Sequence, residues 1–386
     1  MSRNCVIMKV RDYFPSAPRH DLRHPVAKPA SRMKLFARRR WLVIPVCGAS
    51  LLALSELVLR VLNFGPGHAP LDPDRLLHHV HPKSYSYFAY SRTGEYGGFR
   101  VHYDAGGWRV AAPTKPAAKA PPGCRIAFMG DSFTEAGQVP FEDSFVGLLA
   151  TLTGCEVTNY GVASYSPIFY DIQWKTFVRQ SKPALVVLQL SSDDVLTDAG
   201  MLARAVRDAS GWPVALPDSA DTTVRKFLRR SYLVRVARML QQKLLWGLED
   251  ASRPSEPAGT APEQNPDVSQ LSADLVLSLS RNVHESGAKF VFFAIPAQQR
   301  LANPALKPST PELADKWKAW AQTQGVPYVD VAQAFRGEPE KARSAFLWRD
   351  GHYSGIGHLL TARALCQQLK DFFGERGSCA DLRQRS

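Results

Sequence analysis

Apolar residues along the chain fall into two alternating patterns. Short and nearly uninterrupted apolar runs predict strands at residues 125–129, 156–160, 184–190, 289–295 and 327–331. Apolar residues at helical spacing lie between these runs and predict helices that begin near residues 145, 167, 268, 311 and 355. Strands that alternate with helices indicate an α/β fold: an open, mostly parallel sheet of about five strands with helices on both faces. In such sheets a reactive site lies at the carboxyl ends of the strands.

A longer apolar segment precedes this pattern. Residues 41–55 carry no formal charge, and extension through Glu56 and Arg60 to residue 62 gives a helix of about 33 Å, enough to cross a bilayer core of about 30 Å. Glu56 and Arg60 stand four residues apart and could pair at the far interface. We expect residues 41–62 to be a transmembrane signal-anchor. A buried soluble helix and a cleaved signal peptide are the alternatives.

The distribution of charge gives this anchor an orientation. The net charge is +13, but residues 1–40 hold eleven basic and two acidic residues, so most of the excess lies in this tail. A basic flank stays in the cytoplasm, which predicts a single-pass protein of the inner (cytoplasmic) membrane with its main domain in the periplasm. Residues 1–32 are either part of the cytoplasmic tail or an over-long gene prediction, because Met33 is also a natural start.

The weak charge of the remaining chain argues against a nucleic-acid partner. The sequence also holds no zinc-ligand spacing and no glycine-rich phosphate loop, so we expect no metal and no cofactor.

Composition divides the chain beyond the anchor. Residues 63–122 are expected to form a linker and a small β-rich pre-domain, residues 123–374 the main domain, and residues 375–386 a C-terminal tail. A basic insertion at about residues 200–266 contains an amphipathic helix. A solvated helix face is the simpler interpretation of this helix, and contact with anionic lipid or an acidic glycan is the functional one.

Four cysteines follow the anchor. Cys124 and Cys155 each precede an apolar run, so their sulfurs come within bonding range if the two runs are neighbouring parallel strands. Cys124–Cys155 and Cys366–Cys379 are candidate disulfides, and two or four buried free thiols are the alternative.

Three polar residues at opposite ends of the main domain suggest chemistry. Ser132 directly follows the first strand, and Asp350 and His352 stand just before the last helix. A serine hydroxyl becomes a good nucleophile when a base takes its proton, and a carboxylate fixes the tautomer of that base and stabilises its cation. We therefore predict Ser132 as nucleophile, His352 as base and Asp350 as the residue that orients His352. An ordinary turn at Ser132 and a capping role for His352 are the alternatives.

At about residues 123–374 the sequence resembles the SGNH (GDSL-type) esterases and acyltransferases, in particular membrane-anchored members from bacterial envelopes. The likeness rests on Gly130-Asp131-Ser132-Phe133-Thr134, on residues 159–166 and on Asp350-Gly351-His352. It implies a flavodoxin-like SGNH-hydrolase fold and the same three catalytic residues. It further implies an oxyanion hole built from the main-chain N–H groups of Ser132 and Ser164, where Ser164 stands in place of the family's glycine.

Two further positions depart from the family pattern. Asp193 occupies the place of an asparagine that donates to the oxyanion, whereas an ionised carboxylate only accepts. We expect Asp193 to be protonated or turned away, or the site to have a different charge arrangement, and loss of one such donor costs about 10² to 10³ in turnover. The spacing between Asp350 and His352 is also one residue shorter than is usual in the family.

Together these features predict a membrane-anchored extracytoplasmic serine esterase. Its expected substrate is an acylated envelope polysaccharide, glycan or lipid. One alternative is an O-acyltransferase to a cell-surface glycan, with a membrane acyltransferase as possible partner. The other is a binding or assembly protein that keeps the fold and has impaired catalysis, which the aspartate at position 193 would explain.

Overall fold

The computed structural model describes residues 32–62, 64–91, 93–112, 120–192, 194–218, 223–250, 267–298, 301, 311–373, 379 and 382. The predictions for residues 1–31, for Asp193 and for most of the C-terminal tail lie outside this part of the chain. The chain divides into two compact units, Met1–Ala53 and Leu54–Ser386, and each is considered by itself.

The N-terminal unit contains the greater part of one long helix. Helix α1 (Arg32–Val61) includes the apolar segment Val43–Val61, whose mean hydropathy is 1.7 over 19 residues. Most large apolar side chains of this segment are exposed, among them Ile44, Leu51 and Val61. By length and composition this helix can cross a membrane, although a signal sequence has the same properties.

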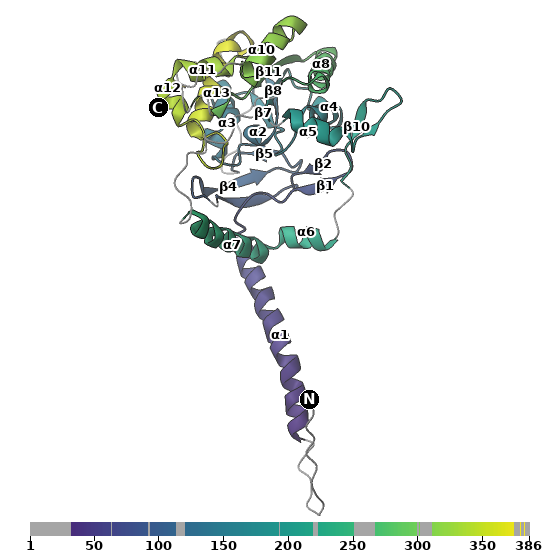
Figure 1. The fold of residues 1–386 in the computed structure, drawn as a ribbon, viewed down its shortest axis with the longest axis vertical. Helices are drawn as coiled ribbons and strands as arrows, with labels where there is room; N and C mark the ends of the chain where they lie inside the picture. Colours follow the sequence, from purple (N-terminus) through teal and green to yellow (C-terminus); the bar gives the residue numbers. More distant parts are fainter. Residues whose placement is uncertain are drawn as a thin grey trace, which may run out of the picture. The chain divides into compact units, whose positions relative to one another are not determined.

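The second unit is built on a seven-stranded mixed sheet with the order β11-β8-β6-β7-β5-β4-β3 (Figure 1). Four parallel strands form one half: β6 (Arg125–Met129), β7 (Glu156–Asn159), β8 (Leu185–Leu190) and β11 (Lys289–Ala294). The antiparallel strands β3 (Ser86–Tyr90), β4 (Gly97–Tyr103) and β5 (Arg109–Val110) form the other half. The predicted α/β fold is confirmed, but its sheet is mixed rather than mostly parallel.

One expectation about the strands was wrong. Residues 327–331 contribute only an isolated bridge, between Tyr328 and Phe292, because Asp330 caps a helix that begins at Val331. Three strands of the expected pre-domain join the main sheet, since β5 pairs with β7 through Arg109 and Asn159, whereas Asp72–Asp74 and His78–Val80 pair in a separate two-stranded sheet. Residue 122 therefore does not separate two sheets.

Helices cover both faces of the parallel strands. On one face α4 (Pro167–Thr176), α8 (Gln270–Glu285) and α10 (Leu313–Gln324) contribute to one apolar core. On the other face α3 (Phe145–Thr153), α11 (Val331–Gly337) and α13 (Gly355–Gln368) contribute to a second core. Alternate residues of β8 point into the two cores, which explains its uninterrupted apolar sequence.

Shorter elements complete this unit. They are β1 (Asp72–Asp74), β2 (His78–Val80), α2 (Ser132–Glu135), α5 (Asp194–Leu202), β9 (Val206–Arg207), β10 (Pro213–Ala215), α12 (Pro339–Arg343), α14 (Lys370–Phe373) and the 3₁₀ turns Phe141–Asp143 and Val178–Ser181. The amphipathic helix predicted in the basic insertion is present as two helices, α6 (Thr223–Arg230) and α7 (Tyr232–Asp250).

Both candidate disulfides are present. Cys124 and Cys155 precede the neighbouring strands β6 and β7, and their Cα atoms are 5.0 Å apart. Cys366 on α13 is bonded to Cys379, with Cα atoms 5.9 Å apart. These covalent links tie β6 to β7 and the chain's C-terminal end to α13.

Candidate active site

The three residues predicted to carry the chemistry lie in one hydrogen-bonded row. The hydroxyl of Ser132 is 2.7 Å from Nε2 of His352, and Nδ1 of His352 is 2.7 Å from Oδ1 of Asp350. Ser132 is the first residue of α2, directly beyond the carboxyl end of β6, and Asp131 caps this short helix by accepting from the N–H of Phe133. The His352 side chain is 27% exposed, so a substrate can reach it from solvent.

A tight turn accommodates the short spacing between Asp350 and His352. Gly351 has a φ of 84°, a left-handed conformation that favours glycine. The N–H of Gly351 donates to the carbonyl of Leu347, and the N–H of Leu347 donates to the carbonyl of His352. This turn brings the side chains on either side of Gly351 into contact, so the departure from the family spacing does not prevent their pairing.

The pairing also sets the charges of both groups. Burial disfavours the imidazolium, but the hydrogen bond and charge of Asp350 outweigh burial and raise the pKa of His352. Burial likewise favours a neutral Asp350, but the hydrogen bond and charge of His352 lower the pKa of this carboxyl. The result is an ionised Asp350 beside an imidazole of increased basicity.

An open cavity of about 280 Å³ lies over this row. Its lining includes Ser132, His352, Ser164, His68 and Gln138. Ser164 has a φ of 65°, so it adopts the left-handed conformation that suits the glycine of the family. The predicted oxyanion residue therefore lines the same cavity as the nucleophile. Among the described residues, no cluster of histidine, cysteine or carboxylate side chains could hold a metal ion.

A comparison with protein families matches part of this unit. Residues 259–379 match the model of the SGNH hydrolase-like domain, acetyltransferase AlgX. The chain carries an SGNH hydrolase-like domain. The predicted resemblance is confirmed, and the match supports an acyl-modifying enzyme. The matched range contains Asp350 and His352 of the SGNH-like site, whereas Ser132 lies before it.

A comparison with solved structures finds distant matches, including the following three. A lipolytic protein of the G-D-S-L family from Desulfitobacterium hafniense is 12% identical, with 63% of this chain and 98% of that chain covered and a TM-score of 0.37. The acetylxylan esterase Axe2 from Geobacillus stearothermophilus is 15% identical, with coverage of 66% and 96% and a TM-score of 0.38. A lipase/acylhydrolase from Enterococcus faecalis is 15% identical, with coverage of 64% and 96% and a TM-score of 0.35. No curated protein matches the chain.

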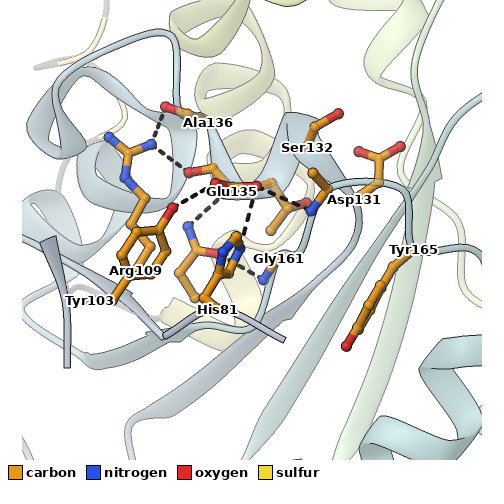
Figure 2. A network of polar contacts seen from close by, with 12 residues as sticks. His81, Tyr103, Arg109, Asp131, Ser132, Glu135, Ala136, Gly161 and Tyr165 are labelled. Carbon is orange, nitrogen blue, oxygen red and sulfur yellow. Dashed lines mark hydrogen bonds and ion pairs between the residues drawn. The ribbon is translucent and has the colours of Figure 1, made fainter. Parts of the chain in front are cut away.

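Sequence reasoning did not find a buried polar network behind Ser132 in the SGNH-like site (Figure 2). Its centre is Glu135, one turn after Ser132 on α2. Oε1 of Glu135 accepts from the hydroxyl of Tyr103 at 2.6 Å, and Oε2 accepts from the N–H of Ala163 at 3.1 Å. Nε2 of His81 lies 3.4 Å from Oε2. Glu135 therefore connects α2 to the residue that precedes Ser164.

Surrounding groups keep Glu135 ionised. Burial alone would raise the pKa of this carboxyl, but His81, Tyr103 and Arg109 together lower it to about 2. Arg109 on β5 is itself fully buried, and its guanidinium donates to the main-chain carbonyls of Glu135, Ala136 and Val139. Arg109 thus closes the turn that follows the nucleophile helix.

A second carboxylate supports the loop that carries Asp350. Glu95 lies between β3 and β4, and its two oxygens accept from the N–H groups of Arg349 and Asp350 at 2.8 and 2.9 Å. The antiparallel half of the sheet therefore supports both parts of the triad, near Ser132 and near Asp350. The Gly-Trp-Arg sequence at residues 107–109 was the one signal of this role, since it holds Arg109.

Other buried carboxylates lie close to the site. Burial and the charge of Asp131 raise the pKa of Asp194 well above its usual range, and burial also raises the pKa of Asp131. Oδ2 of Asp194 accepts from the N–H of Ser191 at 2.9 Å. Asp193, the predicted oxyanion position, lies outside the described residues, so the structure does not place it.

Proposed function

We propose that this chain is an extracytoplasmic serine esterase that removes O-acyl groups from an envelope glycan or lipid. The observation that carries this proposal is the row Ser132–His352–Asp350 beside an open cavity. A turn serine or a capping histidine would not need a carboxylate aligned on the far nitrogen of the ring. The basic imidazole and ionised carboxylate are the charge states that a triad requires.

The geometry supports the following sequence of steps. His352 Nε2 takes the proton of Ser132 as its Oγ attacks the ester carbonyl, and Asp350 stabilises the imidazolium. Collapse of the tetrahedral intermediate expels the alcohol, which receives the proton from His352, and leaves an acyl group on Ser132. Water, deprotonated by His352, then releases the acid and restores the hydroxyl of Ser132.

The negative charge that develops on the oxygen of the tetrahedral intermediate must be stabilised by hydrogen-bond donors. The main-chain N–H groups of Ser132 and Ser164 are the proposed donors, because both residues line the cavity. The Glu135 bond to the N–H of Ala163 supports this assignment, since it fixes the residue that precedes Ser164. Such preorganisation reduces the reorganisation needed during reaction.

The proposed location rests on α1 and the disulfides. Residues 41–62 would anchor the chain in the inner membrane, with the basic tail in the cytoplasm and the enzyme domain in the periplasm. Two disulfides fit an oxidising compartment.

An O-acyltransferase is the second candidate, and the description of the matched domain as an acetyltransferase favours it. In that reaction a sugar hydroxyl, rather than water, attacks the acyl-enzyme and accepts the acyl group. A membrane acyltransferase could supply the acyl group.

A fluorophosphonate probe on the full chain tests the nucleophile. The probe is expected to label the wild-type chain and the control variant Ser210→Ala, whose serine lies on the exposed β9–β10 hairpin, but not Ser132→Ala. Equal labelling of Ser132→Ala, or no labelling of any variant, would favour the non-catalytic binding protein. Hydrolysis of an aryl acetate with and without acetyl-free glycans then separates the two reactions, because a transferase moves acetyl to the glycan.

A further inference from the structure

Helix α7 carries an apolar face that no described part of the structure covers. Leu233, Ala237, Leu240 and Leu244 follow the spacing of one helix face, which we call the outer face of α7. Leu240 is 57% exposed and Leu244 is 67% exposed. On the preceding helix α6, Phe227 is 70% exposed. Large apolar side chains that gather in this way mark a contact surface rather than scattered exposure.

The opposite face of α7 is fixed to the domain. Arg235 is buried, its Nε donates to the carbonyl of Pro66 at 3.0 Å, and its second terminal nitrogen donates to the carbonyl of His68 at 2.6 Å. Its guanidinium also donates to the hydroxyl of Tyr85. These bonds prevent rotation of α7 about its axis, so the outer face cannot turn inward.

The start of α7 is attached to the last turns of α1. The carboxylate of Glu56 accepts from the N–H groups of Tyr232 and Leu233 at 3.1 and 2.8 Å, and from the hydroxyl of Ser231 at 2.9 Å. Arg60 donates to the same carboxylate at 2.8 Å. Glu56 belongs to the apolar segment Val43–Val61. If that segment crosses a bilayer, α7 begins at the bilayer surface.

Exposed cations lie on the polar side of α6 and α7. On α7, Arg238 lines a cavity with Arg235, and the ammonium of Lys243 lies 4.8 Å from the centre of the Tyr90 ring. On α6, Arg229 donates to the carbonyl of Leu71 at 3.2 Å, and Arg230 pairs with Asp72 at 2.5 Å while its side chain stays 54% exposed. An apolar face with Lys and Arg on the polar side is the pattern of helices that lie in a membrane interface, where exposed cations reach anionic headgroups.

We propose that α6 and α7 form an in-plane binding surface for anionic phospholipid. Phe227 and the outer face of α7 would enter the boundary between headgroups and acyl chains, in the same bilayer that α1 spans. This inference rests on the proposed membrane anchor. It gives the domain a second attachment, which would hold the cavity of Ser132 at a fixed height above the membrane.

Spin labels on the full chain test the proposal. Single cysteines replace Leu244, Gln242 or Leu52 in a background with Cys5→Ser and Cys47→Ser, and each labelled chain is reconstituted in vesicles of phosphatidylcholine with one quarter phosphatidylglycerol. Gln242→Cys is the matched control, because Gln242 is exposed on the face of α7 opposite to Leu244. Leu52→Cys reports on the anchor itself.

The readout is the ratio of label accessibility to oxygen, which dissolves in lipid, and to a water-soluble nickel chelate. The ratio is expected to be several-fold higher at Leu244 than at Gln242, and high at Leu52. A water-like ratio at Leu244 with a lipid-like ratio at Leu52 overturns the lipid surface and leaves the anchor intact, whereas a water-like ratio at Leu52 removes the anchor. Low accessibility of Leu244 to both reagents would indicate contact with a partner protein or a second copy, and also overturns the proposal. If the ratio at Leu244 is the same in vesicles with and without phosphatidylglycerol, the proposed preference of this surface for anionic lipid is overturned.

Discussion

The two halves of the sheet contribute to the candidate site in different ways. The parallel half positions Ser132 at the end of β6, and the helices and loops on its faces position His352. The antiparallel half contributes Arg109, Tyr103 and Glu95, whose contacts hold α2 and the Asp350 loop. The proposed reaction therefore depends on groups from the parallel half for chemistry and on polar side chains from the antiparallel half for position. Substitutions of the catalytic residues should therefore lower mainly kcat, whereas substitutions of the supporting residues should lower mainly the free energy of unfolding.

Loss of the nucleophile should give the largest effect, and it should be purely catalytic. Ser132→Ala is expected to lower kcat by about 10⁴ to 10⁶, because no other group in the row can form the acyl-enzyme. Ser132 is partly exposed, so the free energy of unfolding should change little. Ester hydrolysis and urea denaturation of the full chain in detergent measure the two quantities. A large loss of stability would show that Ser132 has a structural role instead.

Removal of the orienting charge should affect both the rate and its pH dependence. Asp350→Asn is expected to lower kcat by roughly 10² to 10⁴, since His352 loses its preferred tautomer and the partner of its cation. His352 must be neutral to accept a proton, so activity rises as pH increases through its pKa. Because Asp350 raises that pKa, the acid limb of kcat/KM in the variant should move to lower pH. An acid limb that stays in place would mean that another group controls it.

The parallel half was far easier to predict from the sequence than the antiparallel half. A strand buried on both faces appears as a continuous apolar run, which is why the predicted bounds of β6, β8 and β11 lie within one residue of the structure. In contrast, β5 has two residues and joins the parallel half through one pair, Arg109 with Asn159. Such a pairing is a long-range property with no local pattern.

The same difference applies to the site. Ser132 was found because it follows a strand, and Asp350 and His352 because they stand just before the last helix and complete a known chemical set with it. Arg109 and Glu135 were missed, because a charged residue is normally expected at the surface and only the fold shows three carbonyls around this guanidinium. Glu135 follows Ser132 by three residues, which places it on the same short helix, but nothing in the sequence shows that it is buried.

A change at Arg109 should reveal the structural role of the antiparallel half. Arg109→Lys is expected to lower the free energy of unfolding by about 4 kcal/mol, because lysine cannot donate to three carbonyls at once and leaves buried acceptors unpaired. Arg125→Lys is the matched control, since Arg125 is an exposed arginine on β6, and should change stability by less than about 0.5 kcal/mol. Equal stability of the two variants would contradict the assigned role of Arg109.

The charge of Glu135 should contribute stability that depends on pH. Its folded pKa of about 2 lies below the usual value of 4.5, so this contribution is present above pH 4.5 and is lost as pH falls toward 2. Glu135→Gln is expected to cost on the order of 3 kcal/mol at pH 7 and clearly less at pH 3. Denaturation of both proteins at the two pH values measures the difference. A cost that does not change with pH would mean that hydrogen bonding, rather than charge, stabilises this residue.

The smallest expected effect concerns Ser164, which directly follows Ala163, the residue whose N–H donates to Glu135. A non-glycine residue at a φ of 65° carries strain of roughly 1 kcal/mol, which Ser164→Gly relieves, while the added freedom of glycine in the unfolded chain costs about 0.4 to 1 kcal/mol. Stability should therefore change by no more than about 0.5 kcal/mol. Lys182→Gly, at a φ of 47° in the turn that precedes β8, is the matched control for the backbone effect. If the N–H of Ser164 is the oxyanion donor, Ser164→Gly should keep kcat within a few-fold of wild type, because the donor is in the main chain. A large loss of kcat in Ser164→Gly alone would assign the function to the serine hydroxyl instead.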